Sequence, residues 1–207
     1  MKLIQLIIKT SLILFIAVGC RDEECLNIEQ LDYYRNLTKD WYTNALIKDQ
    51  IIQNNDSIRM TLIVSDSHTH NFGDIVYDNC GNSYESEYFS VQYGTSLLPV
   101  WLGIDIRWSG LENDGFTFSM SYSYNRSFGE SVSKNSTYDF VLGRTRDNNS
   151  VVKLIEEFEL NDQVLFGVLQ FNFTDTEVDD EIISIYYSKE LGLIKLVFDN
   201  GNSFSVI

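Results

Sequence analysis

The amino-acid sequence predicts an all-β protein, a single antiparallel β-sandwich or barrel-like domain built from consecutive hairpins. The first observation is the alternation of apolar and polar residues along several segments, which is typical of half-buried antiparallel strands. The second is the number of tight-turn signals, of which Asn200-Gly201 is the strongest because both residues tolerate positive φ. The third is the lack of a convincing long helix. We expect nine to eleven short strands, and the alternation leaves sandwich and barrel open.

In the first half of the chain, residues 27–38 show no alternation and fit one short helix, and the period of two begins at Trp41. Met60, Leu62 and Val64 then share one side of a strand. In residues 98–108 the apolar residues fall on one side, and the opposite side carries Pro99, Trp101, Gly103, Asp105 and Arg107. The clearest alternation is in residues 116–124, where aromatic residues and one methionine face serine and threonine across the pleat.

The second half repeats the pattern with turns between the strands. A strand that ends at Asn161-Asp162 is followed by another at residues 165–173, which predicts a hairpin. Further strands are expected at residues 183–187, 194–198 and 204–206. Residues 129–137 are interpreted as a loop between the halves, too short and too ordinary to separate two domains.

The first residues have the pattern of a secretory signal peptide. Lys2 and Lys9 precede an apolar run at residues 12–18, and this run is too short to span a bilayer, which takes about 20 residues. Cys20 follows Ala17-Val18-Gly19 and resembles the lipobox of bacterial lipoproteins, although that motif usually begins with leucine. The resemblance implies that Cys20 is lipidated and becomes the first mature residue. We therefore divide the chain into a signal peptide (1–19), a lipidated tether and lead-in (20–40) and an all-β domain (41–207).

Composition and the end of the chain add a second resemblance. The chain is rich in Asn and Tyr and has one proline, Pro99, as is common in secreted proteins of the Bacteroidota. Its closing residues 185–207 resemble the C-terminal end of uncharacterised Bacteroidota and flavobacterial envelope lipoproteins. The acidic residues 22–24 after Cys20 look like the export signal of their surface lipoproteins, with a plain solvated tether as the alternative. The resemblance implies an outer-membrane lipoprotein, and we favour surface exposure over a periplasm-facing location.

The charge of the mature chain limits its partners. Removing residues 1–19 takes away two lysines and no acidic residue, so the net charge falls from −15 to −17. Such a surface repels phosphate backbones, and the sequence has no basic stripe, which excludes nucleic acid. The same charge keeps the domain off anionic lipid, so the expected contact with the membrane is the lipid on Cys20.

The other two cysteines, Cys25 and Cys80, form an even pair in an oxidising compartment. Their simplest use is one disulfide, worth roughly 4 kcal/mol in the chain-entropy model. Two unpaired thiols are the alternative.

No catalytic motif is present, so we name no catalytic residue and no cofactor. The acidic stretch 175–181 lacks the calcium-loop pattern and is interpreted as a solvated turn. Asp66, His68 and His70 are the only possible metal ligands that stand close together in the sequence. If the strand through Val64 continues, these three residues lie on its core-facing side. Two exposed loop histidines are the alternative, and we predict no stoichiometric metal.

Two further features bear on function. The aromatic row 116–124, with Trp101, Trp108, Tyr88 and Tyr93, fits either a sugar-stacking platform or a core, and the core is the commoner use of such a stripe. Ser57, in Asp56-Ser57-Ile58, resembles a Bacteroidota O-glycosylation site. We expect a lipid-anchored, non-enzymatic envelope protein with a binding or structural role. The alternatives are a hydrolase of envelope or dietary polymers and a carrier of a small apolar ligand.

Overall fold

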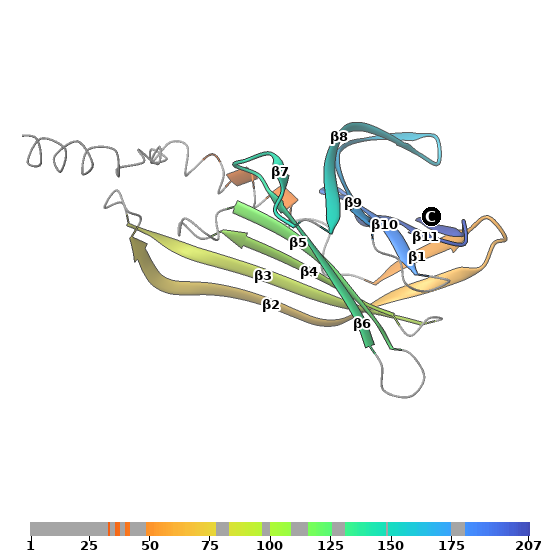
Figure 1. Cartoon of the computed structure of the whole chain (residues 1–207), viewed down its shortest axis with the longest axis horizontal. Helices are drawn as coiled ribbons and strands as arrows, with labels where there is room; N and C mark the ends of the chain where they lie inside the picture. The colour runs from red at the N-terminus through yellow and green to blue at the C-terminus, as the bar shows by residue number, and fades with distance from the viewer. Residues whose placement is uncertain are drawn as a thin grey trace, which may run out of the picture.

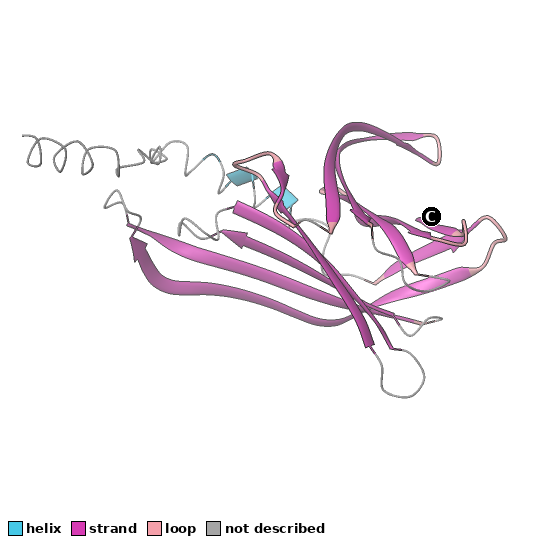
Figure 2. Ribbon diagram, viewed as in Figure 1, coloured by secondary structure: helices cyan, strands magenta, loops and turns pink. Residues whose placement is uncertain are grey.

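The computed structural model describes residues 33, 36–37, 40–41, 49–77, 83–96, 100–108, 116–125, 131–147, 149–174 and 181–207. At residues 66–77, 83–87, 108, 125 and 131 this description stops at the backbone. Apart from the helical residues before Asp49, the regular structure in these ranges is all strand (Figure 2). The prediction of an all-β fold is therefore confirmed. Trp41 itself is helical, so the expectation that strand periodicity starts there is wrong.

The twelve strands in the described ranges form one antiparallel sheet made largely of consecutive hairpins (Figure 1). They are β1 (Gln50–Asn54), β2 (Arg59–Tyr77), β3 (Ser83–Thr95), β4 (Val100–Trp108), β5 (Phe116–Asn125), β6 (Ser131–Asp139), β7 (Arg144–Thr145), β8 (Ser150–Leu160), β9 (Gln163–Phe173), β10 (Ile182–Ser188), β11 (Gly192–Phe198) and β12 (Ser203–Val206). Their order in the sheet is β7-β6-β5-β4-β3-β2-β1-β12-β11-β10-β9-β8. The first and last strands therefore pair in the middle of the sheet, with Ile52 opposite Val206.

The sheet curls until its two ends meet, so the barrel-like alternative is the one observed. The seam lies where β8 begins. Ser150 Oγ donates to Ser136 Oγ of β6 at 2.7 Å, and Val152 N donates to Thr145 Oγ1 of β7 at 2.6 Å. Beyond this seam β8 and β6 separate (Figure 1), so the barrel is nearly but not fully closed.

The alternating stripes predicted from the sequence line the inside of this barrel. Met60, Leu62 and the inner residues of β4 and β5 are almost fully buried. Aromatic rings fill the centre: Phe118 lies 4.8 Å from Tyr187 and 5.6 Å from Phe171, between ring centroids. Trp41, which precedes the first strand, joins this core and stacks on Tyr187 at 6.1 Å. The buried residues of the aromatic row 116–124 therefore belong to the core. Of the two uses considered for this row, the core was the one that the spacing of the stripe favoured.

Two of the predicted hairpin turns have the expected backbone. Asn161 and Asp162 both have positive φ, 48° and 62°, which is the geometry of a type I′ turn. Gly201 follows Asn200 with a φ of 84°. These turns set the register of β8 with β9 and of β11 with β12.

The interpretation of residues 129–137 as a loop is wrong, because Ser131–Asp139 is strand β6, paired along its length with β5. The segment has no apolar alternation because its inward positions include Lys134 and Ser136. Lys134 forms an ion pair with Glu181, and Ser136 accepts the hydrogen bond of the seam. A strand with polar partners inside the barrel carries no hydrophobic signal for sequence reasoning to detect.

The hairpin of β8 and β9 leaves the barrel and arches over β10 and β11 (Figure 1). Gly167 makes this possible with a φ of 65°, a conformation that favours glycine. At this position the alternation of β9 reverses, so that Leu165 and Val168 face the same side. Both pack with Ile194 of β11 in a second, smaller apolar cluster beneath the arch.

Candidate functional site

The outward side of β3–β6 carries mostly short polar side chains and glycines. Since the alternate positions of these strands are buried in the core, every second residue faces outward. We call this surface the hydroxyl face; its members are Ser90, Gln92, Gly94, Gly103, Ser119, Ser121, Ser123, Ser133, Asn135 and Thr137. Because these side chains are short, the hydroxyl face is flat, and larger side chains project from it.

Trp101 of β4 is a large apolar side chain on this face, with 46% of its surface exposed. It pairs across the sheet with Gly94 of β3. A methyl group placed on Gly94 would lie 3.2 Å from Cζ3 of Trp101 and within 3.7 Å of two further ring atoms. The indole therefore rests on the glycine backbone, and nearly half of the Trp101 surface is exposed to solvent. This contact also has a structural use, because an aromatic ring shields the exposed backbone of a strand glycine.

A polar cluster lies further along β4 on the same face. Tyr88 Oη donates a hydrogen bond to Asp105 Oδ1 at 2.5 Å, and the Arg107 guanidinium lies 5.0 Å from the centre of the Tyr88 ring. Burial raises the pKa of Tyr88, and its hydrogen bond to Asp105 raises that pKa further. The phenol is thus a protonated donor at neutral pH. Asp105 lies four residues from Trp101, or about 13 Å along the strand.

The expectation that Asp66, His68 and His70 lie on the core-facing side is wrong. Val64 pairs with buried Tyr93, but Asp66 pairs with Gln92, so one extra residue is inserted in β2 between them. Such a bulge reverses the faces of all later residues of the strand. His68 consequently pairs with Ser90, and His70 pairs with Tyr88.

This reversal adds three β2 positions to the hydroxyl face, next to the cluster of Tyr88 and Asp105. The alternative of a polar loop after Val64 is also wrong, because β2 continues to Tyr77. The side chains of Asp66, His68 and His70 are not described. Among the side chains that are, no group of three His, Cys, Asp or Glu residues could hold a metal ion.

A second polar cluster lies inside the barrel. Glu181, 5% exposed, accepts a hydrogen bond from Tyr122 Oη at 2.8 Å. Lys134 Nζ lies 2.8 Å from the same carboxylate oxygen, as an ion pair whose geometry falls outside that of a hydrogen bond. Burial and the bond to Glu181 raise the pKa of Tyr122. This cluster ties β5 and β6 to the start of β10.

The remaining predicted residues are placed as follows. Ser57 is exposed in the turn between β1 and β2, with a φ of 63°, and is accessible for modification. Tyr93 is fully buried and belongs to the core. Outside the described part of the chain lie Cys20, Cys25 and Cys80, the acidic stretch 175–180 and the side chain of Trp108.

Sequence reasoning placed Trp101, Asp105 and Arg107 on one side of a strand, and the structure puts that side on the surface. The positions of Gly94 beneath Trp101 and of Tyr88 beside Asp105 were missed. No sequence signal marks them, because the partners come from another strand and depend on the register.

Comparison of the chain with protein-family models, with curated proteins and with solved structures finds no match. In the described ranges, no helix has the length and hydropathy needed to cross a membrane.

Proposed function

We propose that the protein is a lipid-anchored envelope protein whose β domain is a non-enzymatic binding module, with a carbohydrate ligand held on the hydroxyl face. The anchor is Cys20, and the location is the outer membrane, with the domain at the cell surface rather than facing the periplasm. These parts of the proposal rest on the lipobox-like sequence and on the acidic residues that follow it.

The observation that carries the choice of ligand is Trp101. A sugar ring has an apolar side made of C–H groups, which packs on a flat aromatic surface, and hydroxyls at its edge that need donors and acceptors. Trp101 offers an indole that is supported by Gly94, and 46% of the residue's surface is exposed. The short hydroxyl side chains around it, with Asp105 further along the strand, supply the polar partners.

Charge indicates which carbohydrates fit. The mature chain has a net charge of −17, which repels polyanionic glycans as it repels nucleic acid. A neutral polysaccharide avoids this repulsion. We therefore propose a neutral glycan chain as the ligand.

The two alternatives have less support. A glycoside hydrolase needs two carboxyl groups on either side of the scissile bond. Of the described carboxylates on this side of the sheet, Asp105 is engaged by Tyr88, and Asp139 is buried against Arg146 at 2.7 Å. A carrier of an apolar ligand needs interior space, whereas the described interior is filled by packed aromatic rings.

The test is native affinity electrophoresis of the mature protein in gels containing xylan, a β-glucan or a galactomannan. We expect one of these polysaccharides to retard the protein, and Trp101→Ala to weaken binding by up to about tenfold, the worth of one aromatic stacking contact. Ile51→Ala is the matched control, because Ile51 is equally exposed, at 46%, but lies on β1. Equal retardation of the Trp101→Ala variant and the wild type would refute this site.

The anchor and location are tested separately. Cys20→Ser should release the protein from the membrane fraction or leave it as unprocessed precursor, because the lipid is the expected membrane contact. Protease added to intact cells should digest the domain if it is surface-exposed. A cleaved Cys20→Ser protein that stays with the membranes would contradict the anchor.

A further inference from the structure

Strand β8 is one edge of the sheet, and part of its backbone pairs with no further strand of the described residues. Its first residues are tied to β6 and β7 at the seam. From Lys153 to Leu160, the partner of β8 among the described residues is β9, on one side only. The other side presents a row of main-chain N–H and C=O groups about 26 Å long, to which a further strand can be added.

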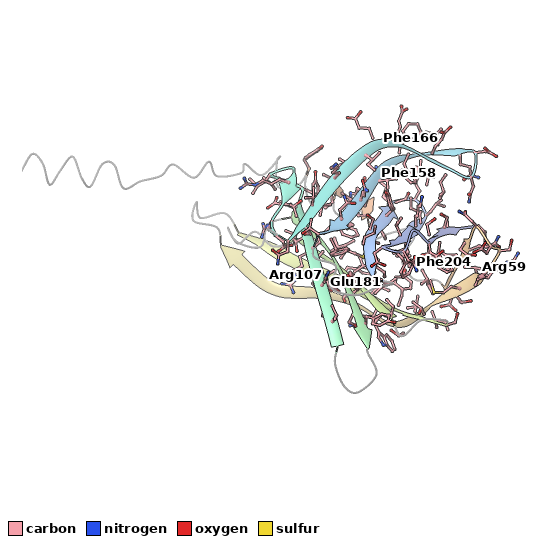
Figure 3. The ribbon with its side chains drawn as sticks, turned by 45° about the vertical axis from the view of Figure 1, so that its right-hand side comes forward. Arg59, Arg107, Phe158, Phe166, Glu181 and Phe204 are labelled. Atoms are coloured by element: carbon pink, nitrogen blue, oxygen red, sulfur yellow. The ribbon has the colours of Figure 1, made fainter. Side chains whose placement is uncertain are left out.

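The two faces of this edge differ in chemistry. On the side of the arch that faces β10, the side chains are apolar and half-buried: Ile155, Phe158 and Leu160 pack against the second cluster, with Phe158 lying 5.1 Å from the Tyr186 ring. On the outer side, Glu157 and Glu159 are exposed. In Figure 3, Phe158 lies beneath the arch and Phe166 lies at its top.

Exposed apolar residues continue this outer side onto β9. Phe166 pairs with Glu157, and Val164 pairs with Glu159. These two apolar side chains are 54% and 50% exposed. Carboxylates thus stand directly beside uncovered apolar surface along the outer side of the hairpin.

We propose that β8 binds an extended segment of another polypeptide as an added strand, and that this segment alternates apolar and basic residues. Its apolar side chains continue the row of Ile155, Phe158 and Leu160 over the second cluster. Its lysines or arginines lie on the outer side, beside Glu157 and Glu159. Strand addition of this kind takes affinity from main-chain hydrogen bonds and specificity from alternate side chains.

Charge complementarity selects this partner over a second copy of the protein. Two β8 edges placed side by side would bring the same glutamates together, on molecules that each carry a net charge of −17. The glutamates also have a protective use, since charged residues on an edge strand oppose aggregation. Protection alone, however, would not produce binding of an alternating basic strand.

The test uses a nine-residue peptide of alternating leucine and lysine and the whole mature protein, with binding followed by fluorescence anisotropy. We expect this peptide to bind at least tenfold more tightly than a peptide of the same composition in block order. A version with every backbone amide methylated keeps the charge but cannot pair, and should lose the binding. Hydrogen exchange should show protection of the amides of residues 153–160.

Two variants test the role of charge. Glu157→Lys with Glu159→Lys should weaken binding of the alternating peptide at least tenfold. The matched control is Asp56→Lys with Glu190→Lys, which changes the net charge by the same amount at exposed turn positions outside β8. This control should leave most of the binding intact. Equal binding of the methylated or block peptide, or protection away from β8, would overturn the proposal.

Discussion

Loss of the Lys134 ammonium should destabilise the barrel strongly, because it removes the positive charge that lies 2.8 Å from the buried Glu181 carboxylate. Lys134→Met removes the charge and keeps an apolar stem of similar length. Glu181 would remain 5% exposed, with the hydrogen bond from Tyr122. Breaking a buried ion pair from one side typically costs roughly 3–5 kcal/mol.

The structure places the expected value near the lower end of that range. The side chain of Lys134 is 17% exposed and that of Glu181 is 3% exposed, so some water reaches the lysine. We expect a loss of about 3 kcal/mol in the free energy of unfolding. For a domain of this size each kcal/mol lowers Tm by about 2–4 °C, so the variant should melt roughly 6–12 °C below the wild type.

A double-mutant cycle separates the ion pair from the packing. The free energies of unfolding of Lys134→Met, Glu181→Gln and the double variant are measured by urea denaturation followed by far-UV circular dichroism. In the double variant both charges of the ion pair are removed, and the new amide oxygen still accepts from Tyr122, so we expect most of the lost stability to return. Lys153→Met, at an exposed position on β8, is the control and should change stability by less than about 0.5 kcal/mol.

Two results would refute this reasoning. The first is a Lys134→Met variant within about 1 kcal/mol of the wild type, which would mean that water or other groups solvate Glu181 well. The second is a double variant whose loss equals the sum of the two single losses. Additivity would show that Lys134 and Glu181 do not stabilise one another.

Three further predictions follow from the tyrosines, the cysteines and the histidines. The increases in pKa that burial causes, above the ordinary value of 10.0, are largest at Tyr93, Tyr122 and Tyr187. The stability that these phenols contribute is complete below pH 10 and is lost above it, at about 1.4 kcal/mol per pH unit for each. We expect cooperative unfolding between about pH 11 and pH 12, with tyrosinate absorbance rising at the same pH, and gradual ionisation without unfolding would contradict this. Mass spectrometry of non-reduced protein from the envelope should find the Cys25 and Cys80 peptides joined, and free thiols at both positions would exclude the bridge. Elemental analysis should find no stoichiometric metal; about one zinc per chain, lost in His68→Ala with His70→Ala, would reverse that expectation and favour a hydrolase.

The apolar strands were predictable from the sequence because one face of each is buried. Residues 118–123 and 100–107 show this, since their alternate residues are core and surface as expected. The turn at Asn161-Asp162 was predictable for a local reason, namely the positive φ that both residues tolerate.

The errors have a physical origin in polar contacts and in register. Strand β6 was taken for a loop because Lys134 and Ser136 point inward to partners distant in sequence. The face of His68 and His70 was mistaken because a single inserted residue before Asp66 reverses the alternation. No local pattern marks such a bulge, and it decides which side chains share the hydroxyl face.

The pairing of β1 with β12 has a consequence for the order in which the chain folds. Asn54 lies opposite Phe204, so this contact joins the two ends of the domain and has a high contact order. Synthesis delivers the N-terminal strands first, and β1 then keeps an open edge until β12 has been made. We expect the sheet of β1–β7 to form first and to stay open at β1. The pairing of β12 with β1 then completes the barrel as the last step. A permuted chain that begins at β8 and joins Ile207 to Asp49 would turn this late step into a local hairpin, and should fold faster to the same structure.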